Sequence, residues 1–135
     1  MIHRIDHVAI VVNDIEAALR VYRDALGLRL SQVQTIPDQD VKIAFLPTGD
    51  SEIELLEPIN PESGVAKFLA KRGEGMHHIC LEVDDLDATL AELAAQGVEL
   101  IDRAPRPGAH GRIAFIHPKG SHGVLIELLE RSSGA

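Results

Sequence analysis

The stretch IDHVAIVVNDIEAALRVY (residues 5–22) returns later in the chain as MHHICLEVDDLDATLAEL (residues 76–93). Each copy contains a histidine, an apolar run, acidic residues and then apolar side chains at helical spacing. His7 and His78 hold the same place in the two copies, 71 residues apart. The repeat therefore predicts a strand followed by a helix with an acidic cap, written twice in 135 residues.

The ends of the two copies repeat as well. IELLE at residues 53–57 returns at residues 126–130, and FLPTGDSEIELLE (45–57) parallels FIHPKGSHGVLIELLE (115–130). Two copies are too few for a solenoid, so we expect a duplicated unit whose halves pack together. Alternating and apolar runs separated by turn residues give each half the order βαβββ.

These patterns predict an α+β fold of two tandem βαβββ modules related by pseudo-twofold symmetry. The first module covers about residues 3–57 and the second about residues 76–131, joined by residues 58–75 with a short helix. A tail, RSSGA (131–135), is expected to pack against nothing. The expected strands are 3–12, 28–36, 41–47 and 51–57, then 77–83, 98–102, 112–117 and 123–130; the module helices end near Gly27 and Gly97, and the connecting helix near Gly73.

The composition favours one globular domain over residues 1–135. Hydrophobic residues make up 45% of the chain and charged residues 25%. The net charge of −8 argues against nucleic acid or an anionic membrane as a partner. No apolar run reaches the length of a membrane span, and the start lacks a signal-peptide pattern. Cys80 is the only cysteine, which excludes an internal disulfide and agrees with a cytoplasmic location.

Each module places one histidine in its first strand and one glutamate in its last: His7 and Glu54, then His78 and Glu127. If the modules pair about a twofold axis, these four side chains converge. Two imidazoles and two carboxylates suit one divalent transition ion such as Co, Zn, Ni, Mn or Fe. His77 is an alternative to His78, but the repeat aligns His78 with His7.

Each of these residues also has an ordinary structural explanation. A lone histidine in an apolar strand is most often a core residue, and a strand glutamate usually faces solvent. Glu127 is expected on the same strand face as Leu125 and Leu129, because side chains two residues apart share a face. Its carboxylate would then be buried and would need a partner for its charge. Ala9 and Cys80 follow the two histidines by two residues and leave space on the same strand face. The matched positions in both modules favour the metal site.

Five segments resemble the vicinal oxygen chelate superfamily and, within it, the methylmalonyl-CoA epimerase branch: IDHVAI, IELLEP, VAKFLAKRGEGMHHICLEV, GAHGRIAFIHPK and HGVLIEL. The resemblance runs from Ile5 to about Arg131. It implies a curved mixed sheet around a central metal site, a homodimer, and a CoA thioester as the small-molecule substrate. It also implies that His7, Glu54 and the second pair bind the metal, with cobalt favoured.

The resemblance further implies an epimerase that interconverts (R)- and (S)-methylmalonyl-CoA through a metal-stabilised enolate. Glu127 is one expected acid/base group. The opposite group is a glutamate in some relatives, and Lys42 is taken as the matching position here. The loop with His110 and Arg112 and the surface cation Lys119 are candidates for contacts with CoA. Two alternatives stay open: a glyoxalase-type isomerase, and a metal-free module that binds a small ligand.

Overall fold

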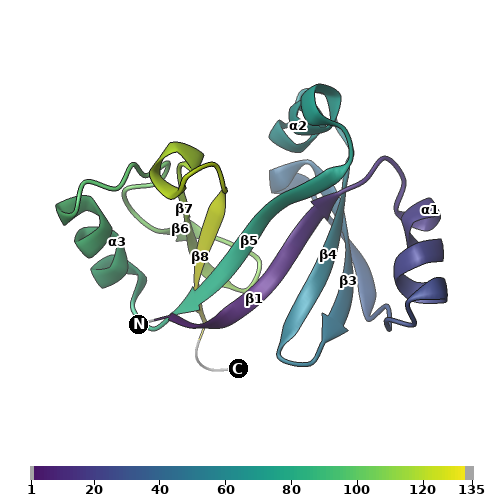
Figure 1. The fold of residues 1–135 in the computed structure, drawn as a ribbon, viewed down its shortest axis with the longest axis horizontal. Helices are drawn as coiled ribbons and strands as arrows, with labels where there is room; N and C mark the ends of the chain where they lie inside the picture. The colour runs from purple at the N-terminus through teal and green to yellow at the C-terminus, as the bar shows by residue number, and fades with distance from the viewer. Residues whose placement is uncertain (1, 133–135) are drawn as a thin grey trace. The chain divides into compact units, whose positions relative to one another are not determined.

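The computed structural model describes residues 2–132, which form two compact units (Figure 1). The first unit comprises residues 7–77. The second comprises the described residues from 78 onward together with those up to Asp6. The strand β1 (Ile2–Val11) therefore contributes to both units, and so does β5 (Gly75–Val83). The first strand of each module is thus divided, which the sequence repeat does not reveal.

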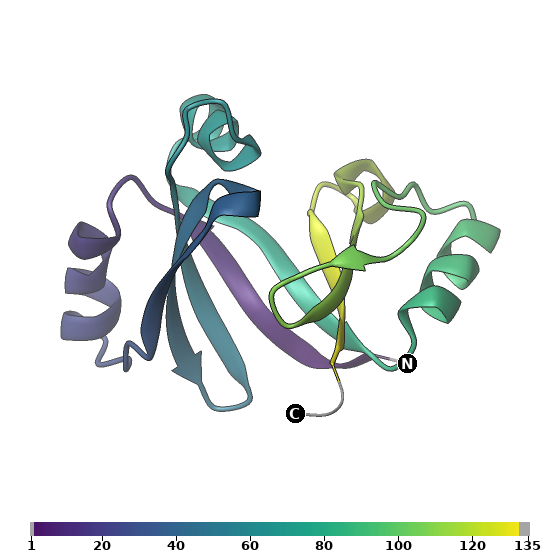
Figure 2. The same ribbon diagram turned by 180° about the vertical axis from the view of Figure 1, so that it is seen from behind.

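The first unit contains a four-stranded mixed sheet and two helices. Its strands lie in the order β2-β3-β4-β1. β1 runs parallel to β4, and the other neighbours are antiparallel. Figures 1 and 2 show α1 along one face of this sheet. The elements after β1 are α1 (Ile15–Leu19), β2 (Gln32–Ile36), β3 (Val41–Thr48), β4 (Ser51–Pro58) and α2 (Gly64–Arg72).

The helix α1 begins where the sequence predicts. Asp14 has an extended backbone, and its carboxylate accepts a hydrogen bond of 2.9 Å from an N–H of the first turn. Residues Arg20–Ala25 continue the helix in the wider π form, and the N–H of Leu26 then donates to the carbonyl of Val21. Gly27 follows at φ 81°, a left-handed conformation that favours glycine at a helix end.

The other two helices also have side-chain caps. Ser63 accepts a hydrogen bond from the third residue of α2 at 3.0 Å. Asp85 caps α3 (Leu86–Ala95) in the same way, again at 3.0 Å. Gly73 ends α2 as predicted, at φ 78°. Across residues 2–132, no helix has the length and apolar character needed to cross a membrane.

The sheet of the first unit is buried on both faces. The face that packs against α1, the helix face, has a core that includes Leu19 and Leu55. The opposite face is the far face. The far face carries Ala9 and Phe45, and α2 packs there through Phe68. Side chains alternate between the two faces along each strand, so the parity of a residue number decides its surroundings.

The second unit repeats this arrangement. Its strands lie in the order β5-β8-β7-β6, with β5 parallel to β8 and the other neighbours antiparallel. The helix face packs against α3 through Leu90 and Leu128, and the far face carries Cys80, Ile113 and Leu129. The prediction of two βαβββ modules is therefore confirmed. The remaining strands are β6 (Arg106–Pro107), β7 (Gly111–Ile116) and β8 (Ile126–Arg131).

The predicted strand at residues 98–102 is wrong. Leu100 makes only an isolated bridge with Ile116, and the regular strand β6 forms later in the chain. Asp102 gives the physical reason. Its carboxylate accepts the backbone N–H of Phe115 at 2.8 Å, so a side chain takes the place of a neighbouring strand at that point.

The expectation of an unpacked tail is wrong for its first residue. Arg131 is the last residue of β8, and its guanidinium pairs with Asp6 and, at 3.3 Å, with Glu82. An arginine in the tail thus has partners on two other strands. Residues 133–135 of the same expectation lie outside the described part of the chain.

The repeated IELLE motif supplies a helix cap in both units. A carboxylate oxygen of Glu57 accepts the N–H of Ile15, the first residue of α1, at 2.9 Å. A carboxylate oxygen of Glu130 accepts the N–H of Leu86, the first residue of α3, at 2.8 Å. The last letter of the motif therefore belongs to the helix face in each module.

Candidate metal and acid/base site

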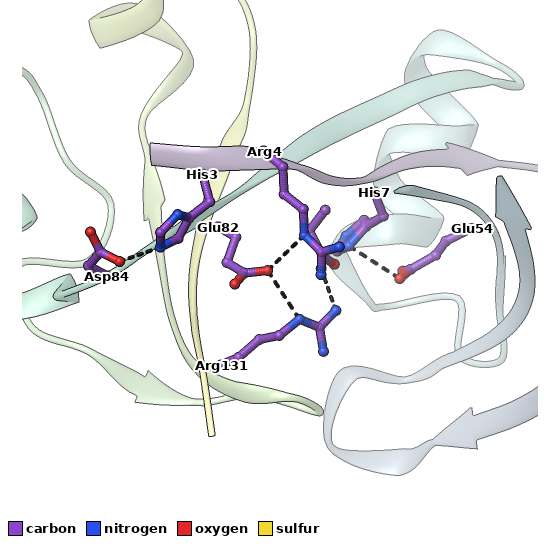
Figure 3. Close-up of polar contacts among 8 residues, drawn as sticks. His3, Arg4, His7, Glu54, Glu82, Asp84 and Arg131 are labelled. Carbon is purple, nitrogen blue, oxygen red and sulfur yellow. Dashed lines mark hydrogen bonds and ion pairs between the residues drawn. The ribbon is translucent and has the colours of Figure 1, made fainter. Parts of the chain in front are cut away.

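His7 and Glu54 form a buried pair within the first unit. Nδ1 of His7 lies 3.3 Å from a carboxylate oxygen of Glu54, and each side chain is 7% exposed (Figure 3). The parallel register of β1 and β4 explains the contact. Ala9 lies beside Glu54, and His7 shares the face of Ala9 two residues earlier. A small residue beside the pair is what the sequence predicts.

His78 and Glu127 form the equivalent pair within the second unit. Nε2 of His78 lies 3.0 Å from a carboxylate oxygen of Glu127, and the side chains are 9% and 12% exposed. Cys80 lies beside Glu127 in the parallel register of β5 and β8. His77 belongs to the first unit instead, where its ring packs edge-on against Phe68 of α2 at 4.8 Å.

A phenylalanine lies next to each glutamate, which the sequence reasoning missed. Phe45 on β3 is directly opposite Glu54, and Phe115 on β7 is directly opposite Glu127. The ring of Phe115 also meets the ring of His78 edge-on, at 5.7 Å between centroids. The signal was present in the sequence, because the parallel segments at 45–57 and 115–130 both begin with phenylalanine.

The spacing in both pairs suits a metal ion. Bonds from such an ion to an imidazole nitrogen or a carboxylate oxygen are about 2.0–2.2 Å long, so adjacent ligand atoms lie about 3 Å apart. The nitrogen–oxygen separations are 3.3 Å and 3.0 Å. Two carboxylates with two neutral imidazoles carry charges that balance a divalent cation. Each pair therefore fits as half of a mixed ligand set.

Comparison with known proteins identifies the family of the chain. Residues 6–115 match the family described as the glyoxalase/bleomycin resistance protein/dioxygenase superfamily. The chain belongs to this superfamily. The match begins one residue before His7 and takes in both modules as far as β7. It agrees with the superfamily that the sequence motifs suggest.

Individual relatives in the superfamily cover nearly all of the chain. The uncharacterized protein YqjC of Bacillus subtilis is 43% identical over 95% of this chain and 92% of its own length. The ethylmalonyl-CoA/methylmalonyl-CoA epimerase of Cereibacter sphaeroides is 42% identical over 95% of this chain and 98% of its own. A solved methylmalonyl-CoA epimerase in complex with methylmalonyl-CoA and NH4+ is 39% identical, with a TM-score of 0.89 over 98% of this chain and 97% of that one.

Lys42 does not share a face with Glu54 in this member of the superfamily. Its neighbour on β4 is Glu57, whose carboxylate caps α1, so Lys42 lies on the helix face. Side chains one residue apart on a strand face opposite sides of the sheet, so the Lys42 amine lies on the side away from Glu54. The structure does not support Lys42 as the second acid/base group. The far face of β3 instead carries Val41, Ile43 and Phe45.

Arg112, a candidate for CoA binding, also lies on a helix face. Its guanidinium donates to Glu130 at 3.0 Å and to Asp87 of α3 at 2.9 Å. The hydrogen bonds from Arg112 and the N–H of Leu86 lower the pKa of the Glu130 carboxyl. The hydrogen bonds to Glu130 and to Asp87 raise the pKa of Arg112. Arg112 therefore fastens α3 to the sheet, on the opposite face from Glu127.

A polar cluster in the second unit includes two residues that precede His7 in the chain, Arg4 and Asp6. The Asp6 side chain is 2% exposed and pairs with Arg131 and, at 3.7 Å, with Arg4. Glu82 accepts from Arg4 at 3.0 Å and from Arg131 at 3.3 Å. Figure 3 shows both guanidinium groups directed at Glu82. Two arginines thus neutralise two carboxylates and hold the start of β1 in the second unit.

Proposed function

We propose that this chain is a metal-dependent epimerase that interconverts (R)- and (S)-methylmalonyl-CoA. The observation that carries the proposal is the buried histidine–glutamate contact found at equivalent positions in both modules, His7 with Glu54 and His78 with Glu127. The substrate is supported by relatives named as epimerases of methylmalonyl-CoA over nearly the whole chain. A superfamily member with two such pairs has the donors that this chemistry needs.

The proposal assigns all four residues of the two pairs to one divalent ion. When bound, this ion supplies Lewis acidity toward the carboxylate and thioester oxygens of the substrate. The duplication supports a shared ion, because each module contributes one nitrogen and one oxygen from the same two strand positions. The low exposure of both carboxylates, 7% for Glu54 and 12% for Glu127, supports it as well, because a metal ion offsets the cost of keeping such charges out of water.

The same glutamates are the proposed acid/base groups. The C2 proton of methylmalonyl-CoA lies between a carboxylate and a thioester carbonyl, so its removal leaves a delocalised enolate. Glu127 takes the proton from one side of C2, and the C–H electrons move toward the thioester oxygen. Glu54, the equivalent carboxylate of the first module, returns a proton to the other side. Glu54 takes this role in place of Lys42, since β3 offers only apolar side chains on that face.

The apolar surroundings of each glutamate support this assignment. Phe115 and Cys80 flank Glu127, and Phe45 and Ala9 flank Glu54. The two phenylalanines and the alanine are apolar, and the cysteine thiol is only a weak hydrogen-bond donor. They also limit water near C2, which preserves the strength of the charge interactions there.

Proton NMR in deuterium oxide tests the proposal directly. Purified protein with its metal restored is mixed with methylmalonyl-CoA, and the C2 proton signal is followed together with the ratio of the two epimers. We expect the C2 signal to disappear and the epimers to equilibrate, and both to stop when a chelator removes the metal. Persistence of the C2 proton in metal-loaded protein would rule out the epimerase.

Two alternative functions give different outcomes in companion measurements. A glyoxalase-type isomerase turns over the hemithioacetal of glutathione and methylglyoxal faster than methylmalonyl-CoA. A metal-free binding module contains no stoichiometric metal after purification. Cobalt as the preferred ion, the homodimer and the cytoplasmic location stay predictions from the resemblance.

A further inference from the structure

Arg106 places a cation on the same sheet face as Glu127. It lies on β6 opposite Ile113, a buried far-face residue of β7. Its guanidinium carbon is 5.4 Å from the centre of the Phe115 ring, and Phe115 is directly opposite Glu127. The same ring meets His78 at 5.7 Å. A single aromatic ring therefore separates this cation from the histidine–glutamate pair of the second unit.

The guanidinium of Arg106 is held in place by two contacts. Its Nε donates to one oxygen of Asp102 at 3.1 Å, and the other oxygen of Asp102 accepts the N–H of Phe115 at 2.8 Å. The Phe115 ring supports the face of the guanidinium by a cation–π contact. One carboxylate and one ring thus fix both the position and the tilt of a side chain that is still 48% exposed.

The outer edge of this guanidinium is open. Within residues 2–132, the two terminal nitrogens of Arg106 make no hydrogen bond, because its only polar contact runs through Nε to Asp102. Three other arginines of this unit, Arg4, Arg112 and Arg131, pair with protein carboxylates. Arg112 pairs with Asp87 of α3 on the helix face, while Arg4 and Arg131 both pair with Glu82. Arg106 alone in this set presents a free planar fork, the geometry that binds carboxylate or phosphate through two parallel hydrogen bonds.

A cation on this face of the sheet suits the proposed substrate. Acyl-CoA substrates carry several negative charges, the chain has a net charge of −8, and Glu127 adds a local carboxylate. Resting on the proposed function, we infer that Arg106 binds an anionic group of the acyl-CoA substrate through its terminal nitrogens. The group is either a CoA phosphate or the free carboxylate of the acyl part, since each presents a pair of anionic oxygens to the two terminal nitrogens.

The test measures binding of three thioesters to wild-type protein and to Arg106→Gln by calorimetry. Methylmalonyl-CoA carries both anionic groups, propionyl-CoA lacks the acyl carboxylate, and methylmalonyl-pantetheine lacks the phosphates that follow the pantetheine arm in CoA. Arg103→Gln is the matched control, since Arg103 is an exposed arginine of the same loop without a hydrogen bond or ion pair among the described residues. Thermal unfolding of each variant verifies that the fold is intact.

We expect Arg106→Gln to weaken methylmalonyl-CoA binding by about 10- to 100-fold, the range for a charge-assisted hydrogen bond. Equal loss with propionyl-CoA and none with methylmalonyl-pantetheine assigns Arg106 to a phosphate. The reverse pattern assigns it to the acyl carboxylate. Arg106→Lys keeps the positive charge but not the planar guanidinium, so its affinity for methylmalonyl-CoA should fall between that of wild type and that of Arg106→Gln.

Two results would overturn the inference. If Arg106→Gln binds all three thioesters within twofold of wild type, Arg106 is a surface residue. An equal loss of affinity in Arg103→Gln would also overturn it, because the loss would then come from lowering the positive charge of the loop and not from a specific contact of Arg106. Because propionyl-CoA binding needs no turnover, failure of the epimerase assay alone leaves this result readable. Failure of the wild type to bind any acyl-CoA overturns both the substrate class and the inference.

Discussion

Glu54 and Glu57 lie three residues apart on β4, and their side chains face opposite sides of the sheet. Glu54 meets His7 on the far face, while Glu57 caps the first residue of α1 on the helix face. Glu127 and Glu130 on β8 divide in the same way. An odd spacing along a strand reverses the face, so one motif serves a chemical site and a structural cap in both modules.

The cap can be separated from the chemistry by mutation. Glu57→Ala removes the acceptor for the N–H of Ile15 and should lower the free energy of unfolding by about 1 kcal/mol. For a chain of this size that is a fall in Tm of roughly 3–5 °C. Proton exchange and epimerisation at 25 °C should stay within twofold of wild type. Glu57→Gln keeps an acceptor and should recover part of the stability; an equal loss would show that the charge, not the hydrogen bond, is what matters.

The metal prediction concerns His7 and His78. Alanine at either position removes one nitrogen ligand from the proposed set of four, so bound metal measured by mass spectrometry should fall well below one per chain. Activity should fall at least about 100-fold with it. Each variant should still unfold cooperatively, because the neighbouring cores do not depend on the imidazole. Full metal occupancy in both variants would end the proposal of a shared ion.

The carboxyl of Glu130 should contribute to stability in a pH-dependent way. Its folded pKa is lowered from 4.5 by the hydrogen bonds of Arg112 and by the N–H of Leu86. A lowered pKa means that the ionised form stabilises the fold above the unfolded value, and that this stability is lost as pH falls through the folded pKa. Glu130→Gln should therefore be less stable than wild type near neutral pH, and the difference should shrink as pH falls below the ordinary pKa of a glutamate and through the lowered folded pKa. A difference in Tm that does not vary with pH would contradict this.

Substitutions at Asp6 and at Arg131 should lower the free energy of unfolding by different amounts. Arg131→Met removes the close guanidinium partner of the Asp6 carboxylate, which is 2% exposed, and should lower the free energy of unfolding by about 3 kcal/mol. Asp6→Asn leaves Arg131, which is 39% exposed and can be solvated by water, so it should cost less. Urea unfolding of both single variants and the double variant measures the difference. A larger cost for Asp6→Asn would show that the buried charge is not what the pair protects.

The final prediction separates the two acid/base candidates. Lys42→Met should leave exchange and inversion unchanged within twofold, since Lys42 lies on the helix face opposite Glu57. Glu54→Gln should slow inversion by about 10²–10⁴-fold. Deuterium should still enter one epimer with retention, provided that metal content is intact. NMR of the deuterated products distinguishes the two; a loss of inversion in Lys42→Met would restore the lysine as the second group.

Much of the fold could be predicted because the duplication gives each pattern twice. The strand–helix copies, the acidic caps at Asp14 and Asp85 and the closing glycines all lie where the sequence indicates. The strand expected at 98–102 could not be recognised as wrong. Its apolar pattern is that of a strand, and only the side chain of Asp102 bonding to Phe115 interrupts the ladder.

The pairing of His7 with Glu54 could also be predicted, because repeat position and strand parity both point to it. Lys42 shows the limit of the same reasoning. Side chains one residue apart on a strand face opposite sides of the sheet, and the sequence contains no nearby marker that fixes the register of β3. The proposed binding role of Arg106 could not be predicted from the sequence. It depends on the register of a two-residue strand and on what the other arginines bind.

The division of β1 and β5 between the two units bears on how such a chain can be cut or rebuilt. A break in the connector before α2 would yield two fragments of similar length, and neither would hold a complete unit. Arg4 and Asp6 would leave with one fragment, and their partners Glu82 and Arg131 with the other. The fragments would therefore have to complement each other to fold.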